Sequence, residues 1–246
     1  MLPALIVFLA GLALGTLLNV LIIRIPRERR LLGWPRCTRT GAPLAPWQLI
    51  PVAGWLLQRG RAPDGRRLHW IYPFVEVTAA LTLLRLYQLY GFGPAFFYLA
   101  FVCAVLIVTG AIDWLYRYIY TFVILGAALV VIVAGPLAGL NWLNVVLGAL
   151  TGGFVFMLFY LVARLLFSGS GVPFGLGDVY LAIFIGAAVG LLNLAPALFY
   201  GMLLAGVVSA GILIARRAGR STPTYIAYGS YLCLGTLLFI ALGGMG

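Results

Sequence analysis

Residues 94–112 read PAFFYLAFVCAVLIVTGAI, a run of 19 residues without a charged side chain, and Asp113 follows it directly. An α-helix needs about 20 mainly apolar residues to cross the hydrocarbon core of a bilayer. The run is therefore long enough and apolar enough to span a membrane. It predicts a transmembrane helix that ends at an acidic residue.

The composition of the whole chain agrees with this interpretation. Of its 246 residues, 64% are hydrophobic and only 9% are charged, whereas a soluble domain is about 45–50% apolar and about 25% charged. A water-soluble globule would lack the polar side chains to cover its surface, and disordered, collagen-like or coiled-coil chains need polar or strictly periodic sequence. The sequence therefore predicts an all-α polytopic membrane protein.

Comparable apolar segments recur along the chain and predict about eight membrane helices. The first has no cationic region before it and no A-x-A-like cleavage site after it, so we expect a retained helix and not a signal peptide. The sixth is short, and we expect a tight hairpin at residues 193–196 after it. The expected spans are residues 2–23, 71–90, 94–112, 118–135, 142–166, 179–192, 196–215 and 225–242.

The distribution of arginine predicts the orientation in the membrane. All 16 basic residues are Arg, against five acids, which gives a formal net charge of +11. Ten Arg lie in the connector 24–70, and the further Arg-bearing connectors alternate with connectors that carry no charge. By the positive-inside rule the Arg-rich side is cytoplasmic. Arg85, inside an expected span, departs from this pattern, and the sequence does not predict its role.

Nucleic-acid binding is not expected from this charge, because the Arg residues flank apolar runs instead of forming a polar basic surface. The connector 24–70 is rich in Pro and Gly, which predicts loops with at most short helices. Its apolar piece 49–57 favours packing against the membrane face, and its Arg residues suit contact with anionic lipid headgroups. We divide the chain accordingly into a first transmembrane helix (1–23), a basic cytoplasmic loop (24–70) and a transmembrane core (71–246).

The five acids narrow the search for chemistry. Glu28 and Asp64 lie in the basic loop, whereas Glu76, Asp113 and Asp178 lie within or at the ends of apolar runs. An acid at the centre of a membrane helix costs about 2.5–3.5 kcal/mol on insertion scales, so such residues are candidates for function. In the expected topology Asp113 and Asp178 come from different helices and reach the same, cytoplasmic, boundary.

Two converging carboxylates without evident metal ligands suggest an acid–base pair. Like charges a few ångströms apart do not both ionise easily, so the pair would share one proton. The ionised member could take a proton from an attacking water, and the protonated member could donate to a carbonyl oxygen. The structural alternatives are that Asp113 pairs with Arg117 one turn later and that Asp178 caps its helix. The motif Gly175-Leu-Gly177-Asp178 alone does not decide between them, because glycines also serve packing and capping.

Six segments in a fixed order carry a resemblance to a known family. They are GTLLNVLIIRIP (15–26), IPVAGWLLQRGR (50–61), YPFVE (72–76), Ile112-Asp113, FGLGDVYLA (174–182) and IAYGSYLCLG (226–235). In these segments, over nearly its full length, the chain resembles the bacterial type IV prepilin leader peptidases, which are membrane aspartic proteases with a GxGD signature.

The resemblance implies an endopeptidase that removes the short basic leader from type IV prepilins or pseudopilins, for pilus assembly or type II secretion. It implies action at the cytoplasmic face of the bacterial inner membrane. It also implies that Asp113 and Asp178 are catalytic and that Gly175 and Gly177 shape the supporting loop. Where the family's first aspartate segment usually continues to Pro-Asp, this chain has Tyr120-Thr121, so Asp113 is the one acid of that segment.

The basic loop departs from the family. Its members commonly carry two C-x-x-C pairs there, which resemble a tetrahedral zinc site. Here Cys37 is present, but Thr40 stands at the partner position, and Ala62 and Gly65 replace the second pair. One Cys and the lone His69 do not complete a four-ligand site, so we expect no zinc.

The resemblance also implies a second activity, methylation of the new N-terminal amine by S-adenosylmethionine. The match through Glu76 keeps this activity open, whereas the missing cysteines argue against it, and no glycine-rich nucleotide fingerprint is present. Glu76 could equally pair with an Arg of the loop. The sequence does not predict the oligomeric state.

Two other functions stay open as alternatives. One is a non-catalytic membrane protein of pilus or secretion assembly, against which the intact Asp113 and Asp178 argue. The other is a proton-coupled transporter of small solutes, whose acids we would expect nearer the bilayer midplane.

Overall fold

The computed structural model describes residues 2–28, 30, 33–34, 43–62, 65, 67–166, 175–217 and 227–245. Cys37, Thr40 and Asp64 lie outside these residues, as do Phe174 and Ile226 of the segments quoted above. Within the described ranges the regular structure is helical, apart from one isolated bridge between Arg61 and Arg67. The chain divides into two compact units, Met1–Phe92 and Gly93–Gly246, and each is described by itself.

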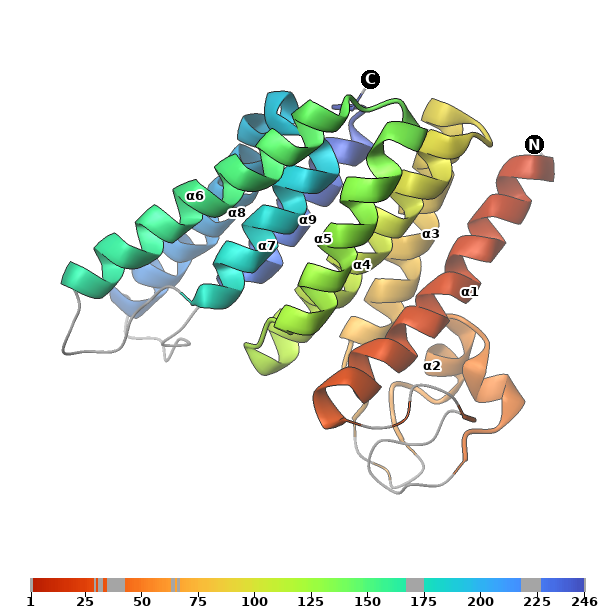
Figure 1. Ribbon diagram of the computed structural model, residues 1–246. Coiled ribbons are helices and arrows are strands. Elements are labelled where there is room, and N and C mark those ends of the chain that lie inside the picture. Colours follow the sequence, from red (N-terminus) through yellow and green to blue (C-terminus); the bar gives the residue numbers. More distant parts are fainter. Residues whose placement is uncertain are drawn as a thin grey trace. The chain divides into compact units, whose positions relative to one another are not determined.

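The first unit is a pair of long helices with short helical turns between them. Its elements are α1 (Leu2–Arg24), η1 (Ile25–Arg27), η2 (Pro46–Leu49), α2 (Ala53–Leu57) and α3 (Ile71–Tyr90). The turns gather at the end of the unit where α1 ends and α3 begins (Figure 1). The expected loop with at most short helices is therefore confirmed for the described part of 24–70.

Glycines spaced four residues apart let α1 approach α3 closely. A Cβ at Gly11 would lie 2.5 Å from Cα of Ala80, and a Cβ at Gly15 would lie 2.5 Å from Cα of Glu76. Such small-residue stripes are typical of membrane helices, because close backbones gain van der Waals contact where no hydrophobic effect acts between helices. The close approach also brings the polar side chains of α1 within reach of Glu76.

The second unit is a bundle of antiparallel helices. Its elements are α4 (Pro94–Tyr116), α5 (Thr121–Ala134), η3 (Gly135–Ala138), α6 (Trp142–Leu166), α7 (Leu176–Val189), α8 (Leu191–Arg217) and α9 (Tyr228–Ala241). Helix α4 packs on α9, α7 packs on α5 and α6, and α8 packs on α9. Because successive helices alternate in direction, the C-terminal end of α4 and the N-terminal ends of α7 and α9 lie at one end of the unit (Figure 1).

Small residues also set the helix contacts of this unit. Gly148 of α6 and Gly186 of α7 touch backbone to backbone, and so do Gly201 of α8 and Gly235 of α9. A side chain adds a further link between two helices of the unit. The hydroxyl of Tyr98 in α4 donates to the carbonyl of Ala188 in α7 at 3.0 Å. The bundle is therefore held by close backbone packing and by a buried hydrogen bond between α4 and α7.

The observed helices agree with the expected spans to different degrees. Residues 71–90 and 142–166 coincide with α3 and α6, whereas α4 continues to Tyr116 and so includes Asp113 in its last turn. The expected hairpin at residues 193–196 is wrong. The chain reverses at Gly190, where φ is +76°, and α8 already begins at Leu191. The N–H of Leu192 in its first turn donates to Oδ1 of Asn144 at 3.2 Å, which satisfies one of the donors exposed at a helix start.

Five helices in the described ranges are long and apolar enough to cross a membrane, and α7 and α9 are apolar but shorter. The long ones are Leu2–Arg27, Pro94–Tyr116, Thr121–Ala138, Trp142–Leu166 and Leu191–Arg217. The prediction of an all-α polytopic membrane protein is confirmed. The count of eight spans and the division into helix, loop and core stay predictions.

Candidate active site

Asp113 lies in the last turn of α4 and is held by the first turn of α9. The backbone N–H of Ser230 donates to Oδ2 of Asp113 at 2.7 Å, and the Ser230 hydroxyl lies 2.9 Å from the same oxygen. That hydroxyl also lies 2.9 Å from the carbonyl oxygen of Gly110, one turn earlier in α4. Asp113 is only 6% exposed. Its carboxylate is therefore a buried group whose orientation is fixed by another helix.

The helix end behind Asp113 is closed by Arg117. This residue has a left-handed conformation with φ of +59°, and its N–H donates to the Asp113 carbonyl at 2.9 Å. The charge of Arg117 acts on the Asp113 carboxylate, as the i, i+4 spacing predicts. The charge of Arg117 at the end of α4 does not explain the bonds from Ser230, however, because these come from α9.

Asp178 lies in the first turn of α7. Its Oδ2 accepts from the N–H of Gly175 at 3.1 Å, and its own N–H donates to the Gly175 carbonyl at 3.1 Å. The side chain therefore does contribute to the start of its helix, which was one structural alternative. It is also 9% exposed and interacts electrostatically with Asp113.

Ile119, in the link between α4 and α5, packs against the first turns of both α7 and α9. A Cβ at Gly177 would lie 2.9 Å from Cβ of Ile119, and a Cβ at Gly229 would lie 2.9 Å from its Cδ1. The same Cβ at Gly229 would lie 3.1 Å from Oδ2 of Asp113. Gly177 directly precedes Asp178 in α7, and Gly229 directly precedes Ser230, which binds Asp113. Ile119 therefore packs between the turn that carries Asp178 and the turn that holds Asp113.

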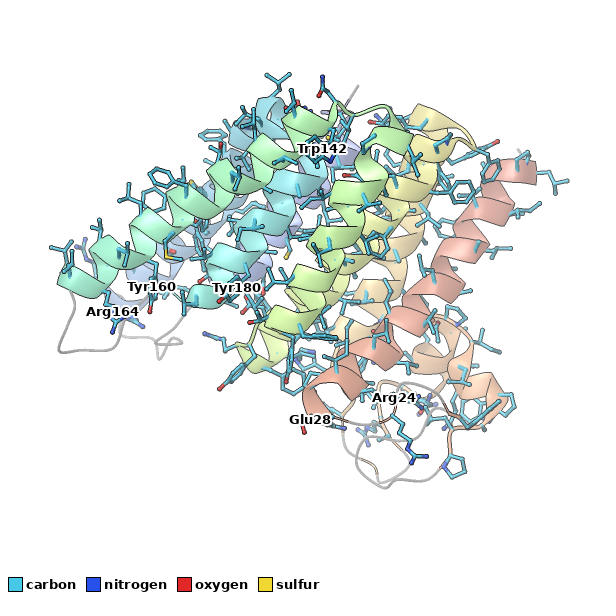
Figure 2. All side chains as sticks on the ribbon, viewed as in Figure 1. Arg24, Glu28, Trp142, Tyr160, Arg164 and Tyr180 are labelled. Atoms are coloured by element: carbon cyan, nitrogen blue, oxygen red, sulfur yellow. The ribbon has the colours of Figure 1, made fainter. Side chains whose placement is uncertain are left out.

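The same end of the second unit carries the charged side chains that the structure describes there. Figure 2 shows Tyr160 and Arg164 near the end of α6 and Tyr180 in the first turns of α7, whereas Trp142 lies at the opposite end. Arg117 closes α4 at the aspartate end, and α8 ends there with Arg216 and Arg217.

Glu76 belongs to the first unit and is surrounded by neutral donors. Its Oε1 accepts from the Thr16 hydroxyl at 2.9 Å and from Nδ2 of Asn19 at 3.2 Å, and its Oε2 accepts from the N–H of Val52 at 2.7 Å. Nδ2 of Asn19 also donates to the Tyr72 carbonyl at 3.0 Å. Glu76 is 8% exposed. It therefore joins α1, α3 and the segment before α2 through hydrogen bonds.

Val52 has an unusual backbone. Its φ is +58° and its ψ is −49°, and the N–H of Ala53 donates across it to the Pro51 carbonyl at 2.5 Å. These values describe a γ-turn of the rare, strained kind. The bond to Glu76 thus holds a strained turn in place.

The remaining metal-ligand candidates are dispersed. Nδ1 of His69 accepts from the N–H of Ile71 at 3.2 Å, and its ring stacks on Trp70 with centroids 5.6 Å apart. Cys103 and Cys233 are buried in the second unit. Among the described residues no group of three or more His, Cys, Asp or Glu side chains is placed to hold a metal ion.

Sequence reasoning did not single out the residues that support these acids, namely Thr16, Asn19, Val52, Ile119, Gly229 and Ser230. Ser230 is part of a segment quoted above, but its hydroxyl gives no local sign that it reaches Asp113. A hydroxyl in the first turn of an apolar helix is the one signal that could have found it.

Two family models match the chain. The Bacterial Peptidase A24 N-terminal domain matches residues 9–90, and the Type IV leader peptidase family matches residues 100–210. The gap between the two matches includes the boundary between the two compact units.

Curated relatives carry the name prepilin leader peptidase/N-methyltransferase. That of Bacillus subtilis (strain 168) is 25% identical over 244 residues, which cover 97% of this chain and 94% of the relative. That of Myxococcus xanthus (strain DK1622) is 28% identical over 225 residues, which cover 89% of this chain and 65% of the relative. That of Xanthomonas campestris pv. campestris is 26% identical over 255 residues, which cover 91% and 86%.

No solved structure matches the chain significantly. The two family models nevertheless cover most of it, one in each compact unit, and the relatives align along nearly its whole length. The chain therefore belongs to the type IV leader peptidase family.

Proposed function

We propose that this chain is a membrane aspartic endopeptidase that cleaves the leader peptide from type IV prepilins or pseudopilins. One observation of the structure supports this most directly. Asp113 and Asp178, from helices far apart in sequence, are both buried at the same end of the second unit and interact electrostatically. Family membership and the names of the relatives point to the same activity.

The pair suits peptide hydrolysis by acid–base catalysis. One carboxylate takes a proton from water as the water oxygen bonds to the scissile carbonyl carbon, and the other carboxyl group donates its proton to the carbonyl oxygen. Because the two carboxyl groups are buried and interact electrostatically, sharing one proton costs less free energy than ionising both. Gly175 and Gly177 serve this pair by shaping the turn from which Asp178 projects.

The position of the acids favours this function over transport. Asp113 lies in the last turn of α4 and Asp178 in the first turn of α7, so neither is near the middle of its helix. A transporter site is typically built near the bilayer midplane. A site at a helix end instead suits a substrate that keeps an apolar helix in the bilayer and presents its cleavage bond at the boundary.

We propose that this boundary is the cytoplasmic one of a bacterial inner membrane. The aspartate end of the second unit carries Arg117, Arg164, Arg216 and Arg217, which the positive-inside rule assigns to the cytoplasm. Reporter fusions after Arg117 and Arg217 should report from the cytoplasm, and fusions at Gly139 and Asn193 from the other side. A cytoplasmic reporter at Gly139 would contradict the orientation.

The loop of the first unit is proposed to touch anionic lipid. Trp47 in η2, Ile50 directly after it and Leu57 at the end of α2 are exposed, and the loop that holds them is rich in Arg. Aromatic and apolar side chains with Arg are typical of segments that lie at the headgroup level.

Methyl transfer stays open as a second activity. The names of the relatives include it, and S-adenosylmethionine would be its cofactor. In the described residues, however, Glu76 and Asn19 are both more than nine-tenths buried and bond to each other. They form an internal polar cluster and do not present a cradle for the cofactor.

The function is tested by incubating the purified protein, in detergent or liposomes, with a prepilin and measuring leader cleavage. Asp113→Asn and Asp178→Asn should each lower cleavage by at least the roughly 10²–10⁴-fold attributed to a positioned acid–base group. Melting temperatures should show that both variants are folded, since Asn nearly preserves the shape of Asp. A chelator should leave cleavage unchanged, because the sequence holds too few ligands for a metal centre.

Each outcome of this experiment decides a part of the proposal. Cleavage that persists in a folded Asp178→Asn variant would overturn the aspartic mechanism. Intact membrane insertion without any cleavage by the unaltered protein would favour the role in assembly, and inhibition by a chelator would overturn the metal-free mechanism.

A further inference from the structure

The two aspartates differ in the donors that hold them. Oδ2 of Asp113 lies within hydrogen-bond distance of two groups of α9, the N–H of Ser230 at 2.7 Å and its hydroxyl at 2.9 Å. Among the described residues, the bond to the Asp178 carboxylate comes from Gly175 at the start of its own helix. Asp113 is therefore positioned by a second helix, and Asp178 by its own.

We propose that Ser230 is a positioning residue that acts on catalysis through Asp113. The proposal rests on the proposed peptidase function. Donors aimed at a carboxylate oxygen stabilise its negative charge and fix the direction of its other oxygen. Arg117 adds positive charge near Asp113, whereas the repulsion between the two carboxylates acts on both alike. Asp113 thus has the surroundings of the ionised partner, which is the one that activates water.

The Ser230 hydroxyl has a second acceptor that makes it suited to a group whose charge changes. It carries one hydrogen and lies 2.9 Å from Oδ2 of Asp113 and 2.9 Å from the Gly110 carbonyl oxygen. When Asp113 gains a proton, its demand for donors falls, and the hydroxyl hydrogen can turn to Gly110 without movement of a heavier atom. The backbone N–H of Ser230 stays in place throughout.

In the catalytic cycle the charge of Asp113 changes twice, which is where the two acceptors of the Ser230 hydroxyl are useful. In the first step an O–H bond of water breaks, the proton goes to Asp113, the oxygen bonds to the carbonyl carbon, and the carbonyl oxygen takes the proton of Asp178. In the second step Asp113 gives its proton to the leaving nitrogen as the C–N bond breaks, and a hydroxyl of the intermediate returns a proton to Asp178. Asp113 is thus charged at the start and end of the cycle and neutral between the two steps.

The test compares Ser230→Ala, Ser230→Thr and a matched control, Ser209→Ala. The hydroxyl of Ser209 in α8 donates to the Ala205 carbonyl at 2.6 Å, so the control also removes one helical serine hydroxyl of the second unit. Ser230→Ala keeps the N–H donor but loses the hydroxyl. Its kcat for prepilin cleavage should fall about 10- to 100-fold, the worth of one hydrogen bond to a charged group, with little change in KM.

Rescue separates positioning from mere packing. Ser230→Thr restores a hydroxyl at the same place and should recover most of the lost kcat, while Ser209→Ala should cleave like the unaltered protein. If Ser230→Ala is folded and keeps full kcat, or if Ser230→Thr is as slow as Ser230→Ala, the positioning role is wrong although the peptidase function stands. If the unaltered protein does not cleave prepilin, the proposed function itself fails.

Discussion

The backbone N–H of Val52 donates to Oε2 of Glu76 at 2.7 Å, and Val52 holds a φ of +58°. A β-branched residue is rarely found at positive φ, because its side chain crowds the backbone there. Such strain persists only where the surroundings hold it in place. In the first unit the Glu76 carboxylate, itself fixed by Thr16 and Asn19, provides that hold.

This relationship predicts that Glu76→Gln lowers the stability of the protein. The NH₂ group of the substituted side chain would stand where a carboxylate oxygen accepts now, so at least one of the three donors would lose its acceptor. This loss should lower the free energy of unfolding by about 1–3 kcal/mol. The measurement is thermal unfolding in detergent, with Glu28→Gln as the matched control because Glu28 is exposed. Prepilin cleavage below the melting transition should be retained, because the aspartate pair is unchanged. An unaltered melting temperature would show that the hydrogen bond from Val52 to Glu76 does not stabilise the protein.

Should methyl transfer be present, Glu76→Gln is expected to impair that activity alone. The measurement is transfer of labelled methyl groups to the mature prepilin, with cleavage as the internal control. Equal loss of both activities in the folded variant would contradict separate roles for Glu76 and the aspartates.

The two glycines before Asp178 should respond differently to an added methyl group. A Cβ at Gly177 would lie 2.9 Å from Cβ of Ile119, which is closer than such contacts allow, whereas at Gly175 the nearest atom among the described residues is 3.7 Å away. Gly177→Ala must therefore shift the turn that carries Asp178. A displacement of about 1 Å can cost roughly 10²-fold in rate, so we expect a loss of that order in kcat. Gly175→Ala should retain most activity, and equal effects of the two changes would refute the packing argument.

Gly229→Ala should disturb the other aspartate. The new methyl group would lie 2.9 Å from Cδ1 of Ile119 and 3.1 Å from Oδ2 of Asp113, so kcat for cleavage should fall. Ile119→Val removes Cδ1 and opens space on one side, and the double variant Gly229→Ala/Ile119→Val should recover part of the rate. A double variant slower than Gly229→Ala would show that Ile119 does not limit the space.

Two glycines of α8 offer a matched pair for helix packing. Gly201 lies against α9, where a Cβ would be 2.8 Å from Cα of Leu232, whereas at Gly206 no atom of the described part of the chain lies within 4 Å of the corresponding position. Gly201→Ala should therefore lower the melting temperature in detergent. Gly206→Ala should leave it unchanged or raise it, since Ala is favoured over Gly in a helix by roughly 0.5–1 kcal/mol. The same response at both positions would mean that α8 and α9 do not pack as described.

The alternation of Arg-rich and uncharged connectors was enough to predict that Asp113 and Asp178 reach the same end of the bundle. This prediction needs only an even number of helices between the end of α4 and the start of α7. The bounds of the helices at 71–90 and 142–166 were also predicted well, because both apolar runs are long. Pro196 misled the prediction of the hairpin. Pro196 lies inside α8, where its missing N–H removes one hydrogen bond of the helix but does not end it. The reversal instead uses Gly190 at positive φ.

The supports of the aspartates could not be predicted in the same way. The bonds of Ser230 to Asp113 and of Val52 to Glu76 join residues 117 and 24 positions apart, and no local pattern specifies such pairs. They follow from how closely the glycine-bearing helix faces approach, which is a property of the packed unit.

Ile119 makes the spacing of the two acids depend on the volume of one aliphatic side chain. It touches the first turns of α7 and α9 at once, so a larger or smaller residue at 119 moves both turns without altering either aspartate. The volume of a residue that takes no part in the proton transfers is therefore expected to tune the distance between the two acids, and with it the readiness of the pair to share a proton.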